Sequence, residues 1–128
     1  QDLVDSQVKA LKRVVAQAGI EVRDIAAIGI TNQRETTLIW ERDTGRPVHH
    51  AIVWQCRRTA SMIDRLKQEG HAGLIQERTG LLPDAYFSAS KIRWILDELG
   101  LQRQAEEGKL CFGTVDSFLA WHLRAAPT

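Results

Sequence analysis

Apolar side chains recur every three or four positions over residues 2–18, and Gly19 follows them. This spacing predicts an amphipathic helix that ends at the glycine. Residues 25–30 (IAAIGI) then form a short run that is nearly all apolar. A run of this kind after a helix predicts a strand that is buried on both faces of a parallel or mixed sheet.

Two further apolar runs, residues 36–40 and 48–54, flank a polar stretch of turn-forming residues. Asp43 and Gly45 are typical of turns, and Pro47 stands where a strand can begin. The two runs are therefore predicted to form a β-hairpin.

The second half of the chain is predominantly helical by its pattern. Helical spacing predicts helices over residues 57–68, 72–78, 88–99 and 114–123, and an apolar triplet predicts a short strand at 110–112. Strands that alternate with helices favour the α/β class. Three or four strands make a small sheet, whose edges would be exposed, and this suggests that part of the sheet is missing.

The composition excludes several classes of protein. A net charge of +1 over 128 residues favours neither nucleic acid nor an anionic membrane as a partner. No apolar run approaches the roughly 20 residues that span a bilayer. Two distant cysteines, Cys56 and Cys111, form neither a disulfide framework nor a zinc motif, so a reducing cytoplasmic setting is expected.

The polar stretch at residues 31–37 (TNQRETT) joins two apolar runs and contains Arg34 beside Glu35. A guanidinium offers donors and a carboxylate offers acceptors, a combination that matches the hydroxyls of a vicinal diol. Neighbouring strand residues point apart, so both groups can face one ligand only if the backbone turns. A solvated surface ion pair explains the same dipeptide equally simply, and is the commoner case.

Trp54 ends an apolar run and begins the polar turn that holds Arg57 and Arg58. Its indole could pack on the C–H face of a polyol, or it could close the core, as tryptophan more often does. The two arginines could hold an anion or pair locally. Cys56, which precedes them, is expected to be a small buried residue.

The stretch at residues 84–98 (DAYFSASKIRWILDE) carries the third group of candidate residues. Tyr86 precedes a helix and could face a ligand, and Ser88 is predicted to be the N-cap of that helix. Lys91 and Trp94 share one helix face, where a packing contact between them is the simpler interpretation. The chain has no glycine-rich phosphate loop of the G-x-x-x-x-G-K-[ST] or G-x-G-x-x-G type.

Together these stretches resemble the FGGY family of carbohydrate kinases. The segments GITNQRETT, AIVWQCRRTA and TVDSFLAW are similar to family sequences, and the resemblance runs from about Ile25 to Leu123. The family's first signature is matched by Tyr86, Ser88, Lys91, Ile92, Trp94, Asp97 and Glu98. The QRE and WQCRR elements are similar to the branch that phosphorylates glycerol.

The resemblance implies a role for each candidate residue. Arg34 and Glu35 would hydrogen-bond the hydroxyls of glycerol, Trp54 would form an apolar wall against its carbons, and Tyr86 would donate a further hydrogen bond. Lys91 and Trp94 would have structural roles.

The resemblance also implies a partial ribonuclease H-like domain of the actin and hexokinase type, with a mixed sheet and flanking helices. Residues 1–128 would be a fragment of the N-terminal kinase domain, incomplete at both ends. The full-length parent, an expected cytoplasmic homo-oligomer, would use ATP and Mg²⁺ to phosphorylate glycerol.

The family's phosphate-binding hairpin and its aspartate base do not occur in the chain, so no catalytic, cofactor-binding or metal-binding residue is expected in it. The isolated fragment is expected to be inactive. The alternatives are a kinase of another polyol or sugar, a non-catalytic polyol-binding module, and a structural fragment without ligand affinity.

Overall fold

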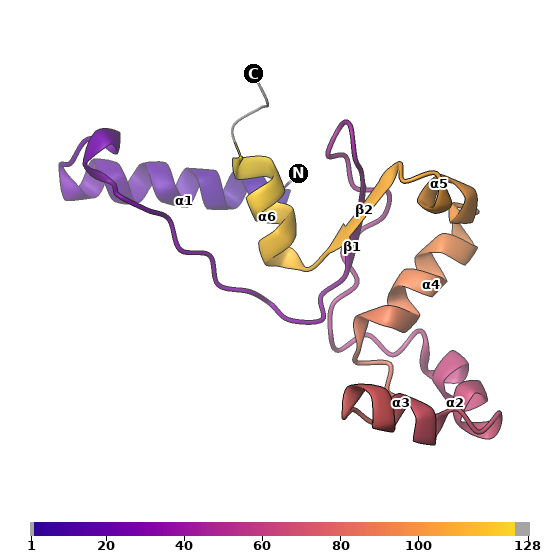
Figure 1. Ribbon diagram of the computed structural model, residues 1–128. Coiled ribbons are helices and arrows are strands. Elements are labelled where there is room, and N and C mark those ends of the chain that lie inside the picture. The colour runs from indigo at the N-terminus through magenta and orange to yellow at the C-terminus, as the bar shows by residue number, and fades with distance from the viewer. Residues whose placement is uncertain (1, 125–128) are drawn as a thin grey trace.

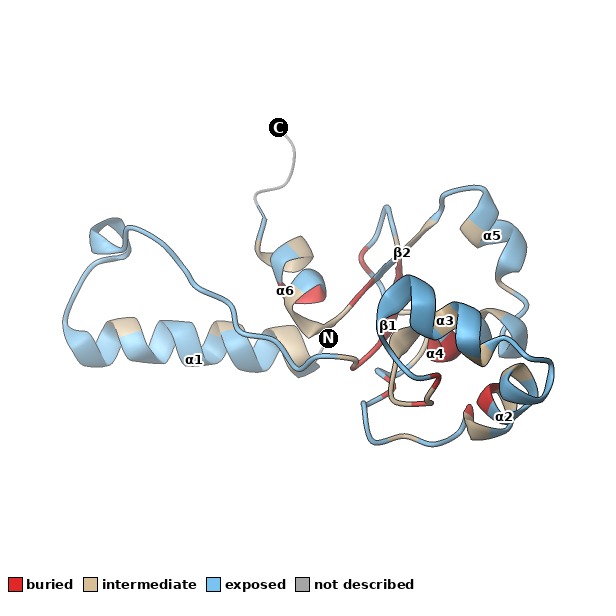
Figure 2. Ribbon diagram, turned by 60° about the horizontal axis from the view of Figure 1, so that its bottom comes forward, coloured by how far each residue is buried: buried red, intermediate tan, exposed pale blue. Residues whose placement is uncertain are grey.

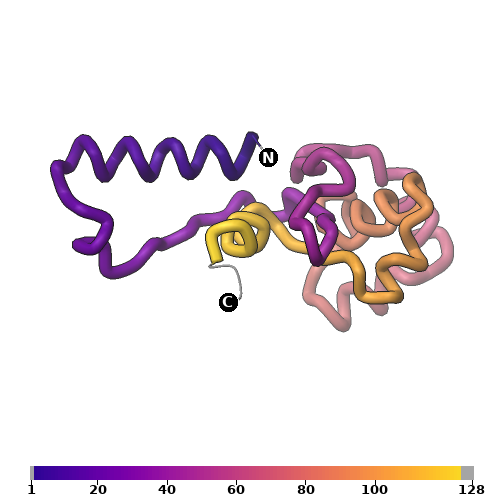
Figure 3. Tube along the Cα trace, turned by 90° about the horizontal axis from the view of Figure 1, so that it is seen from above, coloured from indigo at the N-terminus to yellow at the C-terminus, as the bar shows by residue number. Residues whose placement is uncertain are grey.

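The computed structural model describes residues 2–124, which form a compact body and a long arm (Figure 1). The arm consists of α1 (Asp2–Ala18), the short 3-10 helix η1 (Val22–Asp24) and the extended segment that returns to the body. Figure 3 shows this arm projecting from the body when the molecule is seen from above. The body contains β1 (Leu38–Glu41), α2 (Ala60–Gln68), α3 (Ala72–Thr79), α4 (Ser88–Glu98), α5 (Gln102–Glu106), β2 (Leu110–Gly113) and α6 (Val115–Leu123).

Strand β1 lies at the centre of the body and is buried on both faces. It pairs antiparallel with β2, with Leu38 opposite Gly113 and Glu41 opposite Leu110. Because side chains alternate along a strand, Leu38 and Trp40 point to one side. There they pack against Phe118 of α6, whose ring meets Trp40 edge to face at 5.3 Å.

The other face of β1 supports the second half of the core. Ile39 packs with Ile52 and with Ile95 of α4, and all three are at most 2% exposed. Figure 2 shows that buried residues gather on β1 and on the inward sides of α2, α4 and α6, whereas α1 contributes none. The strand therefore lies between α6 and α4 and packs against both.

The strand expected at residues 25–30 is not formed. The segment is extended but pairs with no other strand among residues 2–124, and Ile28 is 57% exposed. A strand needs a neighbour that satisfies its backbone hydrogen bonds, and the edges of β1 are taken by β2 and by residues 47–52. The sheet of the described residues is thus two-stranded and antiparallel, and the expected mixed sheet was wrong for them.

The predicted hairpin is only partly formed. Residues 47–52 lie along the second edge of β1, where Thr37 and Ile52 exchange two backbone hydrogen bonds of 2.9 and 3.0 Å. Pro47 opposite Trp40 has no N–H to donate, and the chain bends at residues 48 and 49, so the contacts remain isolated bridges. The predicted strand at 48–54 was therefore wrong as a continuous element.

The remaining predictions agree closely with the structure. Helices 2–18, 72–78, 88–99 and 114–123 correspond to α1, α3, α4 and α6, and the strand at 110–112 corresponds to β2. Helix α2 begins at Ala60 instead of Arg57, because residues 58 and 59 form a turn. The short helices η1 and α5 were not predicted. None of the helices in the described part of the chain has the length and apolar character needed to cross a membrane.

Candidate functional site

The backbone turns sharply at Arg34 and Glu35, immediately before β1. Glu35 has a φ of 62°, the one positive value at a non-glycine residue among those described. The Thr36 hydroxyl donates to the Gln33 side chain at 3.0 Å across this turn. Arg34 and Glu35 could face one ligand only if the backbone turned at these residues. The structure contains this turn.

The Glu35 carboxylate reaches the beginning of α4. Its Oε2 accepts a hydrogen bond from the Ser88 N–H at 2.8 Å and another from the Ser88 hydroxyl at 2.7 Å. A helix N-terminus has free N–H groups and a partial positive charge, so a carboxylate is stabilised there. Glu35 therefore caps α4, and the prediction that Ser88 itself is the N-cap was wrong, since α4 begins at Ser88 after Phe87.

Lys91 of α4 is fully buried beneath this contact. Its ammonium donates to the backbone carbonyl of Glu35 at 2.8 Å and to that of Tyr86 at 2.6 Å. Burial lowers the pKa of Lys91, and the negative charge of Glu35 acts in the opposite direction. One side chain thus joins the turn before β1 to the loop before α4.

Tyr86 and Trp54 form an aromatic pair beside the Glu35 turn. Their ring centroids are 5.9 Å apart, and the rings are inclined at 64°. Phe87 lies on another side of Tyr86 with its centroid at 5.1 Å. Trp54 remains 39% exposed, so part of its indole face is available for a ligand.

The loop that carries Tyr86 is fixed by an ion pair. Arg57 donates to both carboxylate oxygens of Asp84, at 2.5 and 3.2 Å, and Asp84 also accepts the Tyr86 N–H at 2.7 Å. The Arg57 guanidinium and then the Tyr86 N–H lower the pKa of Asp84. Of the two roles considered for Arg57, the structure shows the local pair.

Arg34 is exposed, and none of the hydrogen bonds and ion pairs found within residues 2–124 involves its side chain. The segment before it is anchored through Asn32, which donates to Thr114 at 2.9 Å and accepts the Asp116 N–H at 3.2 Å. The structure thus joins Glu35 to Tyr86 through Lys91 and pairs Tyr86 with Trp54, whereas Arg34, which precedes Glu35 in the sequence, is exposed.

The sequence did not predict that Lys91 would bond to the backbone of Glu35 and Tyr86. The Lys91 ammonium turns toward the Tyr86 loop. Trp94 packs under the Arg58 guanidinium at 4.5 Å and against His49. The signal available was the spacing of Ser88 and Lys91, which places both on one side of the first turn of the helix.

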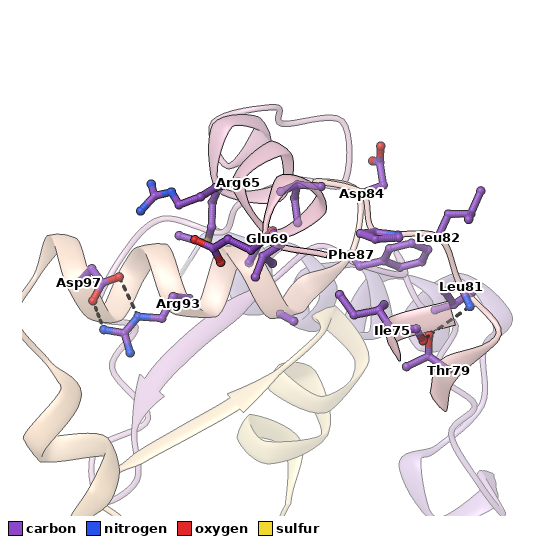
Figure 4. A pocket seen from close by; sticks show the side chains of 16 residues that line it. Arg65, Glu69, Ile75, Thr79, Leu81, Leu82, Asp84, Phe87, Arg93 and Asp97 are labelled. Atoms are coloured by element: carbon purple, nitrogen blue, oxygen red, sulfur yellow. Dashed lines mark hydrogen bonds and ion pairs between the residues drawn. The ribbon is translucent and has the colours of Figure 1, made fainter. Parts of the chain in front are cut away.

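A pocket of about 700 Å³ lies elsewhere, between α2, α3 and α4 (Figure 4). Ile75, Leu81, Leu82 and Phe87 lie at one end, and the Arg93–Asp97 ion pair lies at the other. Neither Glu35 nor Trp54 nor Tyr86 lines it. Its apolar walls do not suit a small molecule rich in hydroxyls.

Histidine, cysteine, aspartate and glutamate side chains are the usual metal ligands in proteins. No group of three or more histidine, cysteine, aspartate or glutamate side chains within residues 2–124 could hold a metal ion together. The described residues therefore offer no preformed metal site built from three or more such side chains.

Comparison with known proteins places these features in context. Residues 1–126 match the model of the FGGY family of carbohydrate kinases, N-terminal domain. The chain is 55% identical over 123 residues to glycerol kinase 2 of Thermotoga maritima and 59% identical over 123 residues to the glycerol kinase of Chromobacterium violaceum. In both cases the match covers 95% of this chain and 25% of the relative, so the chain spans about a quarter of their length.

A solved structure resembles this one closely. It is the crystal structure of Plasmodium falciparum glycerol kinase with ADP, which superposes with a TM-score of 0.76 at 32% sequence identity. The match covers 95% of this chain and 23% of that one. The arrangement of arm and body is therefore shared with a region of a much longer protein.

Proposed function

Since this chain belongs to the FGGY family of carbohydrate kinases, we propose that it forms the glycerol-binding part of a kinase that makes glycerol 3-phosphate from glycerol and ATP. The proposal rests on the names of its relatives together with the chemistry of the site. The whole kinase would be longer than this chain, as the relatives are.

The observation that carries the proposal is the arrangement of Glu35 against the aromatic pair. Both bonds from Ser88 engage the same carboxylate oxygen of Glu35, so the other oxygen keeps its lone pairs for a hydroxyl. The Tyr86 loop shares the Lys91 ammonium with Glu35, and the ring of Trp54 packs against the Tyr86 ring. A small molecule with hydroxyls on a carbon chain needs both an acceptor and an apolar wall.

In this proposal, Arg34 and Glu35 orient the triol. The exposed Arg34 guanidinium donates to hydroxyl oxygens, and the free Glu35 oxygen accepts from a hydroxyl. Trp54 packs on the carbon atoms and excludes water from one side. The Tyr86 hydroxyl donates one further hydrogen bond.

The rest of the reaction would take place outside the residues described. We propose that the complete domain is ribonuclease H-like and that ATP and Mg²⁺ are held by other parts of the longer kinase. The nucleotide supplies the phosphoryl group, and its transfer depends on positioning and charge stabilisation. The residues of this chain would contribute the positioning of glycerol.

The experiment uses the complete gene product that carries this chain, purified and supplied with glycerol, ATP and Mg²⁺. Production of ADP and glycerol 3-phosphate is expected. Glu35→Ala should weaken glycerol binding by about 1–3 kcal/mol, because an acceptor for a buried hydroxyl is lost. Glu106→Ala, an exposed carboxylate on α5, is the matched control and should leave both kinetic constants unchanged.

The result also separates the competing functions. Faster turnover of another polyol or a sugar in a substrate panel would assign that substrate in place of glycerol. Binding of glycerol without formation of ADP would indicate a non-catalytic binding module. An unchanged glycerol KM and kcat in Glu35→Ala would contradict the role given to Glu35.

A further inference from the structure

Lys91 connects two segments that are distant in sequence. The Glu35 carbonyl lies 56 positions before it and the Tyr86 carbonyl 5 positions before it, and both accept from the same ammonium. The side chain has no exposed surface. A buried ammonium is stable only where its protons are accepted, and here two carbonyls accept them.

The Glu35 carbonyl belongs to a residue in a costly conformation. A non-glycine residue at a φ of 62° is disfavoured by the contact between its Cβ and its own backbone. Such a residue keeps this conformation only where its surroundings hold it. The Lys91 ammonium holds its carbonyl, and Ser88 holds its carboxylate, both from the first turn of α4.

The Tyr86 carbonyl is held by the same nitrogen. The ammonium also lies 6.0 Å from the centre of the Tyr86 ring, on the side of the loop that faces α4. Because the Glu35 and Tyr86 carbonyl oxygens lie 2.8 and 2.6 Å from one nitrogen, the Lys91 ammonium holds the two backbones close together.

We propose that Lys91 is a positioning residue for the glycerol site, which holds the Glu35 turn and the Tyr86 loop at the separation that a triol requires, without touching the triol. This inference rests on the function proposed above. Because the ammonium is enclosed and bonded to backbone, it acts through Glu35 and Tyr86.

The test compares Lys91→Met with wild type in the complete gene product. Methionine fills a similar volume but offers no donor, so the two carbonyls lose their partner. The dissociation constant of glycerol, measured by calorimetry without nucleotide, is expected to rise about tenfold or more. The KM for ATP is expected to stay unchanged.

A purely structural role would give a different result. Partial unfolding reduces the number of binding sites per protein and the maximal rate, but leaves the glycerol dissociation constant of the folded molecules unchanged. Lys67→Met removes an exposed lysine from α2 and should change neither constant. If Lys91→Met does not fold, Lys91→Gln, which keeps amide donors, is judged by the same measurements.

The two proposals fail in distinguishable ways. If wild-type protein neither binds nor phosphorylates glycerol, the proposed function is wrong. If wild-type protein binds glycerol and a folded Lys91 variant binds it equally well, the positioning role is wrong while the function stands.

Discussion

Glu35 and Ser88 are 53 positions apart, yet the carboxylate of the first accepts both the backbone N–H and the hydroxyl of the second. One residue thereby both terminates the turn before β1 and caps α4. This double contact makes the side chain important for stability, and the proposed function gives it a second role in ligand binding. The two effects can be measured separately.

Removal of the Glu35 carboxylate should destabilise the fold. In Glu35→Ala the N-terminus of α4 loses its acceptor, and the thermal midpoint should fall by an amount equivalent to about 0.5–2 kcal/mol. Glu35→Gln keeps an acceptor oxygen and should recover part of this loss. Equal midpoints for Ala and Gln would show that the cap contributes nothing.

The left-handed backbone at Glu35 gives a second prediction. Glycine adopts a φ of 62° without the Cβ contact that strains other residues. Glu35→Gly should therefore be more stable than Glu35→Ala by about 1 kcal/mol, although glycine normally destabilises the folded state. Chemical denaturation of the two variants measures the difference, and a less stable glycine variant would argue against the turn described here.

Gly45 should tolerate no side chain. It has a φ of 70°, and a Cβ added there would clash with the Trp121 ring. Gly108 has the same φ, but a Cβ there would meet no atom within 4 Å. Both alanine variants incur the backbone strain, whereas only Gly45→Ala also forces Trp121 to move, so it should be less stable than Gly108→Ala by about 1–3 kcal/mol. Thermal unfolding of Gly45→Ala and Gly108→Ala measures this difference, which reports the clash with Trp121 alone.

The Arg57–Asp84 pair should make stability depend on pH in the acid range. The pKa of Asp84 is lowered in the folded state below its ordinary value of 3.8, first by Arg57 and then by the Tyr86 N–H. The contribution is therefore fully present above about pH 4 and is lost as the pH falls through the lower folded value. The thermal unfolding midpoint of the wild-type protein should thus fall more between pH 5 and pH 3 than the midpoint of Arg57→Gln.

The control for this pH effect is Arg78→Gln on α3. Arg78 is exposed and belongs to none of the ion pairs found in the described part of the chain, so its removal should leave the wild-type acid dependence intact. If the unfolding midpoints of wild-type protein and Arg57→Gln depended on pH in the same way, the Arg57–Asp84 pair would not be the cause of the acid dependence.

Cys56 should be the more reactive of the two thiols. Burial raises its pKa, but hydrogen bonds from the backbone and the guanidinium of Arg58, with Nε 3.1 Å from Sγ, outweigh that effect and lower the pKa below 9.0. Alkylation by iodoacetamide at pH 7.5 should therefore modify Cys56 faster than Cys111, since the thiolate is the reactive form. Arg58→Gln should slow the alkylation of Cys56 and leave the alkylation rate of Cys111 unchanged. Peptide mass spectrometry measures both rates.

The sequence by itself determined the helices and the chemistry of the candidate residues. Helical spacing depends only on neighbours three and four positions away, and it located α1, α3, α4 and α6 correctly. The donors of Arg34, the acceptors of Glu35 and the apolar ring of Trp54 are likewise properties of residue types. The family resemblance, read from spaced motifs, was confirmed by the match over residues 1–126.

Only the tertiary structure decided which segments meet. Residues 25–30 and 48–54 have the composition of strands, but a strand forms only beside a partner, and β1 found its partner in β2 across more than 60 positions of chain. The spacing of Ser88 and Lys91 places them on one side of α4, but the bond from Lys91 to Glu35 depends on how α4 lies against the segment before β1. Long-range contacts arise from packing and the burial of polar groups, and those forces act between residues that no local pattern connects.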